Sequence, residues 1–561
     1  MSTTLAILLC LALPAALSWP LGRYLTNAMQ PAASPRGFDA LFHAVAGPLS
    51  RESQSWTRYL LTMAVFNAVM FAVAAAVLAT QQLLPWNPDG KGALTWDLIF
   101  NTTSSFVTNT NLQHYSGEVS MSHFSQMFAL MWLQFVSAGT GLACLAAMAR
   151  ALAGAQHVGN FLVDLQRAVF LILLPLSLVL AGLYVLGGMP MTPGGAVEAR
   201  TLEGAVQTIA RGPVAAFVAI KQLGTNGGGF FGPNSTHPLE NPGQLTNVAS
   251  MIAILILPMA CVWMFGRLTG RMRHAAVIFA AMLILIGGKL AWSLWAESAP
   301  TPAFIGLPIS QSVGNLEGKE LRLGPATGPL WAVLTTCTSN GSVGAMHDSL
   351  NPLTGLAPLV GMWLNETFGG VGVGMINMFI YIIVAVFLAG MMIGRTPEYM
   401  GKRVEAKEMI FASVTLLVHP LLILGGTAVF AVTSWGLSTI ANTGPHGFSE
   451  ILYEFSSAAA NNGSGFEGLG DNTVPWNVAT GLVMLLARYI PIVLPLAIAG
   501  SLARKRIVAQ TAGTLPVDTP TFGLMLLGVI VLLGALTFLP AAVLGPVADH
   551  LVAIQTFFPQ Q

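Results

Sequence analysis

Long apolar runs alternate with short polar stretches along almost the whole chain. A helix needs about 20 predominantly apolar residues to cross the hydrocarbon core of a bilayer. Ten runs reach that length: residues 3–22, 59–84, 122–148, 168–188, 246–266, 275–296, 359–394, 409–436, 476–500 and 521–545. The pattern therefore predicts an all-α polytopic membrane protein with ten transmembrane helices.

The seventh run, residues 359–394, is too long for one straight span. If it were fully helical it would reach roughly 54 Å, whereas the hydrocarbon core is about 30 Å thick. Gly369, Gly370, Gly372 and Gly374 lie inside it, and glycine weakens a helix and permits irregular backbone. We expect the run to be broken there, although small residues also serve close packing between membrane helices.

The composition agrees with a membrane protein and excludes an ordinary soluble domain. The chain is 54% hydrophobic and only 8% charged, whereas soluble domains carry roughly 25% charged residues. The cysteines are scattered and show no C-x-x-C spacing, so we expect packing residues rather than a disulfide or metal framework. They are Cys10, Cys144, Cys261 and Cys337.

Basic residues predict the orientation, because Lys and Arg concentrate in short cytoplasmic loops. With the N-terminus outside, sixteen of the 24 fall in inner loops: Arg23, Arg36, Arg51, Arg58, Arg150, Arg167, Arg267, Arg271, Arg273, Arg395, Lys402, Arg403, Lys407, Arg504, Lys505 and Arg506. Only six fall outside: Lys91, Arg200, Arg211, Lys221, Lys319 and Arg322. We predict that both termini face outward. The first span has no basic residue before its apolar stretch, so we expect it to be retained and not cleaved.

A short motif recurs four times between predicted spans on the outer side: a small polar residue, then Asn, then Gly or Thr. The copies are Thr108-Asn109-Thr110-Asn111, Thr225-Asn226-Gly227-Gly228, Ser339-Asn340-Gly341-Ser342 and Asn461-Asn462-Gly463-Ser464. Their second residues are 117, 114 and 122 positions apart. Each repeat thus consists of a span, a re-entrant loop and a second span.

A stretch too short to cross a membrane precedes each copy. These stretches are residues 96–107, 202–223, 327–338 and 448–460, and we expect pore half-helices. Non-helical backbone is tolerated at membrane depth only where it is buried in protein or lines a water-filled path. Glycine lets carbonyls turn toward a shared axis and replace the water around a cation. A single Asn-Gly would more often mark an exposed turn, but four evenly spaced copies favour a cation filter.

The four copies are not identical. The first has Thr110 where the others have glycine, so we expect an asymmetric filter without the Thr-Val-Gly-Tyr-Gly sequence of simple potassium channels. Acidic residues near the copies would either raise the local cation concentration at an outer vestibule or be solvated loop charges. They are Glu118, Glu240, Asp348, Glu467 and Asp471.

Three residues of the Asp, Glu, Lys and Arg types fall within predicted spans. Glu366 and Arg488 lie at membrane depth, where a charge is expensive and usually faces a cavity or a partner, so we expect them on the ion pathway or gate. Lys289 lies near a span end, and we expect its side chain to extend to the interface.

The chain shows no sign of a catalytic site of its own. It contains no Asp-Lys-Thr-Gly phosphorylation motif, no Walker A sequence and no inner loop long enough for a nucleotide-binding domain. The segment Gly227–Gly232 matches G-x-G-x-x-G, but it follows no predicted strand and runs into Pro233. The histidines show no metal-ligand spacing.

Several segments resemble the KdpA family, the potassium-binding subunits of bacterial potassium-transporting ATPases, and the similarity runs from the first span to the last. They are Ser105-Phe-Val-Thr-Asn-Thr-Asn111, Gly224-Thr-Asn-Gly-Gly-Gly-Phe-Phe231, Ala345-Met-His-Asp-Ser349, Gly394-Arg-Thr-Pro-Glu-Tyr399 and Gly444-Pro-His-Gly-Phe-Ser-Glu450. The resemblance implies the fold of the superfamily of potassium transporters: four span-loop-span pore repeats plus one extra helix at each end, in the bacterial inner membrane.

The resemblance also implies a role and partners. Potassium would be the transported ion, bound in the filter, while the partner KdpB hydrolyses ATP and KdpC and KdpF complete the complex. Gln113 matches a family position near the filter entrance, and the glycine segment 369–374 acts as a gate in relatives. The implied divisions are residues 1–58, repeats at 59–150, 151–270, 271–400 and 401–506, and a C-terminal helix in 507–561.

Two other functions stay open from the sequence. A passive or ion-coupled potassium uptake channel of the same superfamily would transport without ATP. A membrane scaffold with vestigial loops would transport normally after changes in the filter, although the four Asn-containing copies argue against it.

Overall fold

The computed structural model describes residues 3–30, 36–305, 307–394, 396–507 and 516–557, so Arg395 lies outside the described residues. In this part of the chain, ten helical segments are long and apolar enough to cross a membrane, as predicted. Built from single or consecutive helices, they are α1 (Thr3–Met29), α3 (Trp56–Ala79), α6 (His123–Ser125) with η4 (Gln126–Met131) and α7 (Trp132–Leu152), α8 (Phe161–Arg167) with η5 (Ala168–Leu173) and α9 (Leu174–Leu186), α11 (Gln244–Leu268), α12 (Met272–Ser298), α15 (Val373–Ile393), α16 (Ala406–Phe430), α19 (Val474–Arg504) and α20 (Pro520–Ala542) with η8 (Val543–Val547) and α21 (Ala548–Phe557).

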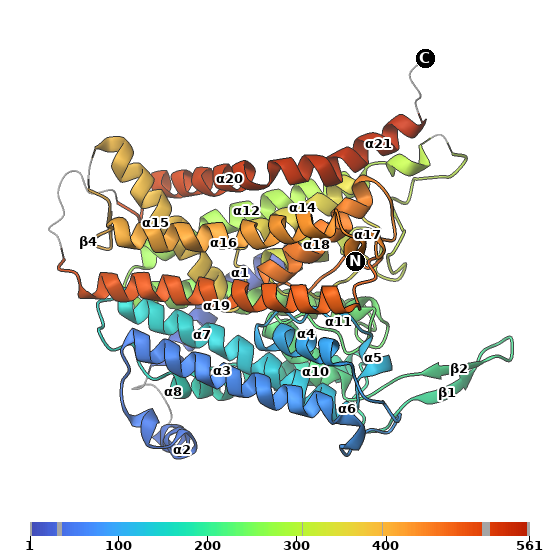
Figure 1. Ribbon diagram of the computed structural model, residues 1–561, viewed down its shortest axis with the longest axis horizontal. Coiled ribbons are helices and arrows are strands. Elements are labelled where there is room, and N and C mark those ends of the chain that lie inside the picture. The colour runs from blue at the N-terminus through green and yellow to red at the C-terminus, as the bar shows by residue number, and fades with distance from the viewer. Residues whose placement is uncertain (1–2, 31–35, 306, 395, 508–515, 558–561) are drawn as a thin grey trace.

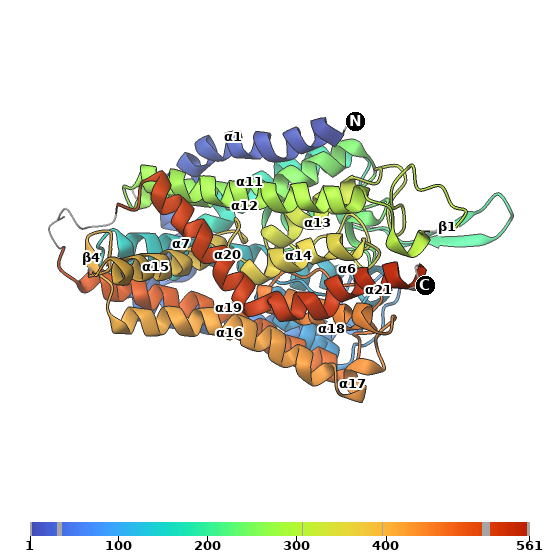
Figure 2. The ribbon, with the colours of Figure 1, turned by 90° about the horizontal axis from the view of Figure 1, so that it is seen from above.

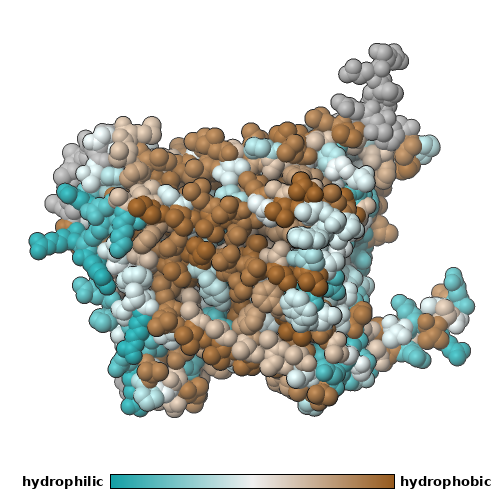
Figure 3. Space-filling view, viewed as in Figure 1, coloured by the Kyte–Doolittle hydropathy of each residue, from teal (hydrophilic) through white to brown (hydrophobic). Residues whose placement is uncertain are grey.

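The long helices lie side by side, and an apolar belt covers the face seen in Figure 3, with hydrophilic residues gathered at the two ends. The helices differ widely in burial. The most apolar windows of α7, α11 and α15 are 83%, 78% and 78% buried, whereas those of α1, α3 and α16 are only 22%, 22% and 17% buried. Since lipid replaces water around a membrane protein, the apolar outer faces of α1, α3 and α16 need no protein cover. The buried helices surround the centre of the molecule.

Shorter helices enter this centre without crossing it. Four of them precede the recurring motif: α4 (Trp96–Val107), α10 (Val214–Leu223), α13 (Thr327–Cys337) and α18 (Pro445–Ala460). Three agree closely with the expected half-helices. The second was predicted too long, because β-branched residues before Gly212 and Pro213 form a strand instead.

That strand belongs to a hairpin at one end of the molecule. β1 (Val197–Arg200) pairs antiparallel with β2 (Val206–Ile209), with Val197 opposite Ile209, and the hairpin projects away from the helices (Figure 1). Helix α1 begins and α21 ends at this same end (Figure 2), so the two ends of the described chain lie on one side, as expected. Which side faces the exterior stays a prediction.

The seventh run is broken, as predicted, and begins earlier than expected. Helix α14 (Pro352–Leu364) stops at Asn365, whose φ is +47°, and α15 starts after Gly372, whose φ is +82°. A Cβ on Gly372 would overlap the carbonyl oxygen of Gly141 in α7, so a side chain does not fit there. The break therefore combines both expectations: irregular backbone and close packing through a glycine.

The chain forms four repeats, each with a span, a half-helix and a second span. They are α3–α4–α7, α9–α10–α11, α12–α13–α15 (with α14 after the loop) and α16–α18–α19. Outside the repeats, α1 packs along α11, and α20 contacts α12 and α15. This is the expected architecture of four pore repeats with one extra helix at each end.

The remaining elements are short connections. They are α2 (Arg36–Ala46), η2 (Pro48–Arg51), η3 (Gln81–Leu83), α5 (Gly117–Ser120), η6 (Asn234–Thr236), η7 (Pro302–Phe304), β3 (Glu398–Tyr399) paired with β4 (Lys402–Arg403), and α17 (Ser434–Leu437).

Candidate functional site

The four half-helices end in loops with the same unusual backbone. One residue in each loop has a left-handed conformation: Asn109 (φ 65°), Thr225 (φ 49°), Ser339 (φ 48°) and Asn461 (φ 50°). Two positions later φ is positive again, at Asn111 (56°), Gly227 (81°), Gly341 (90°) and Gly463 (106°). Non-glycine residues seldom adopt positive φ, so four repeats of this alternation indicate one conserved loop geometry.

Backbone hydrogen bonds fix the alignment of the loops. In each loop, one N–H group donates to the carbonyl of the residue five positions earlier in the half-helix. The donor and acceptor residues are Thr110 and Ser105 (2.9 Å), Asn226 and Lys221 (2.9 Å), Asn340 and Thr335 (2.8 Å), and Asn462 and Ser457 (2.9 Å). Thr110 is therefore equivalent to Asn226, Asn340 and Asn462. The sequence-based match of Asn109 with these asparagines was wrong by one residue. It compared residue types, whereas the equivalence depends on the backbone conformation. The expected asymmetry holds, but the residue in place of glycine is Asn111.

The loops contact one another through asparagine side chains. Asn226 Nδ2 donates to Asn109 Oδ1 (2.5 Å), which joins the second loop to the first. Asn340 Nδ2 donates to the carbonyl of Lys221 (3.2 Å), and Asn462 Nδ2 donates to that of Thr335 (3.0 Å).

The fourth loop closes the ring onto the first, because Asn461 Nδ2 donates to Thr110 Oγ1 (2.9 Å). The contacts run from loop one to two, three, four and back to one. The four recurring motifs thus form a closed ring, whose asparagine side chains hold neighbouring loops together.

The three ring glycines lie directly against the next loop. A Cβ on Gly227 would overlap the carbonyl oxygen of Asn340, and one on Gly341 would overlap that of Asn462. A Cβ on Gly463 would overlap the carbonyl oxygen of Thr110. Glycine is required at these positions for both its positive φ and its lack of a side chain. At the fourth corner Asn111 is accommodated, and its Oδ1 accepts from Gln134 Nε2 (3.1 Å) in α7.

Gly228, Gln113 and Ser464 surround the ring on its outer side. Gly228 packs against Asn111. Gln113 Oε1 accepts from the N–H of Gly229 (2.7 Å), which ties the first loop to the second. Ser464 N–H donates to Asn462 Oδ1 (3.0 Å) and steadies that side chain.

A polar cavity of about 320 Å³ opens above the ring. Its wall includes Gly341, Gly463 and Ser464 of the ring motifs together with Gln113 and His114. Gln113 therefore lies beside the ring, where the family resemblance implied a filter entrance. We call this cavity the outer vestibule.

The acidic residues near the motifs have different surroundings. Glu467 and Asp471 line the outer vestibule, and burial raises the pKa of Glu467 to about 8. Glu240 is fully buried and pairs with Lys221, so it is neither a vestibule charge nor a solvated one. Asp348 pairs with His446 (2.9 Å), and Glu118 accepts from the N–H of Gly232 (2.7 Å).

The irregular segment between α14 and α15 lies below the ring. The N–H of Gly369 donates to the carbonyl of Cys337 (3.0 Å), and the N–H of Val371 donates to Thr225 Oγ1 (3.0 Å). A Cβ on Gly370 would touch the carbonyl oxygen of Thr338 at 3.4 Å, and Gly374 packs against the backbone of Phe368. The segment is thus attached to the second and third loops.

A second cavity, of about 410 Å³, lies on this inner side. Ser339, Asn461, Gly369 and Arg488 are among its lining residues, and it extends between α15, α16, α19 and α20. Arg488 therefore faces a cavity, as expected for a charge at membrane depth.

Glu366 is buried beside Thr367, whose hydroxyl donates to its Oε1 (2.9 Å). Lys289 Nζ donates to the same Thr367 hydroxyl (3.0 Å), and Lys289 is only 6% exposed. The expectation that Lys289 extends to the interface was wrong, because its ammonium group donates a hydrogen bond inside the protein, to Thr367 beside Glu366.

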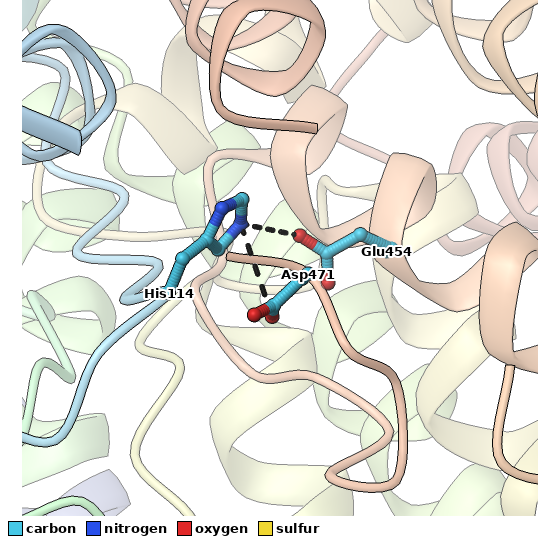
Figure 4. Close-up of side chains that lie close together, drawn as sticks. All are labelled: His114, Glu454 and Asp471. Carbon is cyan, nitrogen blue, oxygen red and sulfur yellow. Dashed lines mark hydrogen bonds and ion pairs between the residues drawn. The ribbon is translucent and has the colours of Figure 1, made fainter. Parts of the chain in front are cut away.

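Sequence reasoning missed one cluster on the wall of the outer vestibule (Figure 4). His114 Nε2 lies 3.0 Å from Glu454 Oε1 and 3.9 Å from Asp471 Oδ2. Its Nδ1 lies 2.7 Å from Asn477 Oδ1. The Asn477 Nδ2 donates to Asp97 (2.8 Å), so Oδ1 is an acceptor and Nδ1 carries a proton.

Both imidazole nitrogens of His114 therefore face hydrogen-bond acceptors, which favours the charged imidazolium. Burial opposes that charge, but Asp471 and the hydrogen bond to Glu454 outweigh it and raise the pKa of His114 to about 9. Burial also raises the pKa of Asp471, to about 7, against the opposing charge of His114. Because 340 positions separate His114 from Glu454, no local motif could have revealed the cluster.

Comparison with known proteins identifies the fold and the family. The potassium transporter TrkH from Vibrio parahaemolyticus has a similar structure, with a TM-score of 0.52 and 14% sequence identity over 79% of this chain and 85% of that chain. At this identity the likeness concerns the fold. The family model for the potassium-transporting ATPase A subunit, KdpA, matches residues 8–551. A match over nearly the whole sequence, on a chain with four pore repeats around a ring of recurring motifs, shows that this potassium-transport protein belongs to the KdpA family.

Proposed function

We propose that this chain is the potassium-binding and ion-conducting subunit of an ATP-driven import complex, and that potassium binds in the ring of four loops. The observation that carries the proposal is the closed ring itself. Three of its corners place a glycine directly against a carbonyl group of the next loop. Such a ring offers backbone oxygens from four sides to a cation that has lost its water.

In the proposed role the ring backbone binds the ion and the asparagine side chains set the spacing. The side-chain amides of Asn226, Asn340 and Asn462 donate hydrogen bonds to the neighbouring repeats. Their side-chain contacts therefore control the diameter of the ring, while carbonyls contact potassium. The half-helices end at the ring, so the negative ends of their dipoles face the ion.

The two cavities give the ion a route. Potassium would enter from the outer vestibule and leave into the inner cavity beside Arg488. The segment containing Glu366, Gly369, Gly370, Gly372 and Gly374 would act as the gate, since it is attached to the ring from below.

The energy would come from a partner. Membership of the A-subunit family supports assembly with an ATP-hydrolysing subunit, KdpB, and with KdpC and KdpF, in the bacterial inner membrane. The distribution of Lys and Arg supports an orientation with both termini outside. The chain itself carries no phosphorylation motif, and we propose that it binds no nucleotide. A passive or ion-coupled channel is the second candidate, because TrkH, which has a similar fold, is a potassium transporter.

The test replaces Gly227 by Asp in the intact complex and measures ATP hydrolysis against potassium, rubidium and ammonium concentration. The new side chain would overlap the Asn340 carbonyl and widen the ring at that corner. We expect the half-saturating potassium concentration to rise at least about tenfold, equivalent to 1.4 kcal/mol, with weaker discrimination between the ions.

The control is Gly90→Asp, which has a similar φ of +64° but no atom within 4 Å of the added Cβ. It should leave affinity and selectivity unchanged. Unaltered affinity and selectivity in a correctly assembled Gly227→Asp complex would argue for a scaffold. Potassium uptake by the chain without ATP would favour the channel.

A further inference from the structure

We propose that His114, Glu454 and Asp471 form a binding site for a divalent transition-metal ion, with Zn²⁺ as the representative, on the wall of the outer vestibule. An ion bound there opposes potassium entry. This second part rests on the proposed function, whereas the binding site does not.

The three donor atoms are already gathered. One ligand atom from each residue lies within 4.8 Å of the others, and the separations from His114 Nε2 are 3.0 and 3.9 Å. Zinc binds imidazole nitrogen at about 2.0–2.1 Å and carboxylate oxygen at about 2.0–2.2 Å, so ligand atoms in a tetrahedral site lie roughly 3.3 Å apart. The His114 and Glu454 atoms are already near this spacing, and Asp471 would move roughly 0.6 Å closer to His114 to reach it.

The histidine is oriented as metal-binding histidines are. Its Nδ1–H donates to Asn477 Oδ1 (2.7 Å), and Asn477 is fixed in turn by Asp97 and Asn472. A hydrogen bond on the other ring nitrogen sets the tautomer and direction of a ligating imidazole. The ring therefore presents Nε2 toward both carboxylates and cannot easily turn away.

The site borders the outer vestibule through Asp471, while the His114 side chain is 0% exposed. His114 and Asp471 line the outer vestibule, and the Asp471 side chain is 25% exposed, whereas that of Glu454 is 2% exposed. Glu454 would thus form the floor of the site and Asp471 its rim. The open side faces the cavity and leaves the fourth position for water, as in three-ligand zinc sites.

Donor chemistry selects the kind of ion. An imidazole nitrogen with two carboxylates suits zinc, nickel or copper, whereas potassium, magnesium and calcium prefer oxygen-only sites. Binding replaces the proton on His114 Nε2, so metal and proton compete for this nitrogen and the affinity falls as the pH is lowered. Potassium at high concentration would not displace the metal from this nitrogen.

Occupancy would act on the ion path through charge. The same cavity wall includes Gly341 and Gly463 of the ring. A divalent ion there neutralises the vestibule carboxylates and repels an incoming cation across a partly dehydrated space. We expect zinc to lower the rate of potassium entry.

The binding test uses the full-length chain purified in detergent, with Co²⁺ as a spectroscopic probe and Zn²⁺ as its competitor. Four-coordinate Co²⁺ absorbs visible light far more strongly than hydrated Co²⁺. His114→Gln and Asp471→Asn are each expected to weaken binding at least about tenfold, since losing only an outer hydrogen-bond partner of a ligand commonly costs 10–100-fold. His157→Gln alters an exposed histidine that belongs to neither cluster of metal-ligand side chains, and it should leave binding unchanged.

Thermal unfolding without metal checks that each variant folds. Asp471 lies on the rim, so Asp471→Asn tests the site even where His114→Gln fails to fold. Unchanged metal binding in a folded Asp471→Asn protein, or loss of binding in His157→Gln, would overturn the assignment.

The transport test measures potassium uptake by the intact complex at increasing Zn²⁺, normalised to the zinc-free rate of the same variant. The half-inhibiting concentration is expected to rise at least about tenfold in Asp471→Asn. Metal binding without inhibition of potassium uptake would overturn the proposed effect on potassium entry, while the metal-site assignment would stand. Because binding is measured on the purified chain, its outcome does not depend on the transport proposal.

Discussion

Lys221 and Glu240 form an ion pair, with 2.6 Å between Nζ and Oε2, in which neither side chain is exposed to solvent. The pair lies behind the second loop of the ring. Lys221 Nζ also donates to Asn234 Oδ1 (2.5 Å), and Asn234 Nδ2 donates to the carbonyl of Gly227 (2.8 Å). Glu240 accepts from the N–H groups of Phe230 and Phe231. A buried charge pair therefore supports the backbone of a ring glycine.

We predict that Glu240→Gln weakens both folding and potassium binding. It leaves the Lys221 ammonium buried without a counter-charge behind the ring, and removing one partner of a buried pair costs about 3–5 kcal/mol. The double variant Lys221→Met with Glu240→Gln removes both charges and should recover a large part of the stability. Thermal unfolding of the purified chain and the potassium dependence of ATP hydrolysis in the complex are the measurements. Equal losses in the single and double variants would mean that the charges are not coupled.

The histidine at the outer end of α18 predicts a dependence of stability on pH. His446 bonds to Asp348 and Asp549, both at 2.9 Å, with Glu450 nearby. Burial disfavours the charged ring, but the two carboxylates outweigh burial and raise the pKa of His446 to about 10. The bridge joins the third loop, the fourth half-helix and α21.

The raised pKa fixes the sign of the effect. The folded state holds the proton more tightly than the unfolded state, where the pKa is about 6.5. The stabilisation is therefore complete below about pH 6.5 and is lost as pH rises toward 10. We expect the unfolding temperature to fall across this window more steeply in the unchanged protein than in His446→Gln. Parallel curves would contradict the bridge. Since His114 is present in both proteins, its own titration largely cancels.

Span number and loop position could be predicted from the sequence because both depend on local patterns. Apolar length determines a span, and the recurring Asn and Gly positions locate the ring. The one-residue shift at Asn109 could not be predicted, because equivalence there depends on backbone φ and on a hydrogen bond to Ser105. A strand at residues 206–209 escaped prediction because a short apolar run suits either helix or strand.

Contacts between charged residues that lie far apart in the sequence could not be predicted either. Lys289 reaches Thr367, 78 positions away, and the burial of the Lys221 and Glu240 pair depends on how the second loop folds back. Charge in a sequence shows only that a partner or water is needed. Which partner a charge finds is decided by packing, so the recurring loop motifs could be located from local signals and the His114 cluster could not.

The contact between the ring and the glycine segment at residues 369–374 leads to a last prediction. Thr225 Oγ1 accepts from the N–H of Val371, at 3.0 Å, and so connects the second loop to the glycine segment below. Thr225→Val keeps the shape but leaves a buried N–H without this acceptor, at a cost of about 1–3 kcal/mol. The left-handed backbone at position 225 makes valine less favourable still, so we also measure Thr225→Ser, which retains the hydroxyl.

We expect Thr225→Val to lower the unfolding temperature and to change the maximal transport rate more than the potassium affinity, because the ring binds through its backbone. Thr225→Ser should restore the rate. Thr427→Val is the control, since that hydroxyl bonds only within α16, to the carbonyl of Ile423 (2.7 Å), among the contacts described, and the residue lines neither cavity. A rate unaffected by Thr225→Val, or an equal loss in Thr225→Ser, would show that this hydrogen bond does not link the gate to the ring. A rate that depends on the hydroxyl would instead make Val371 the point at which ion binding and gate movement meet.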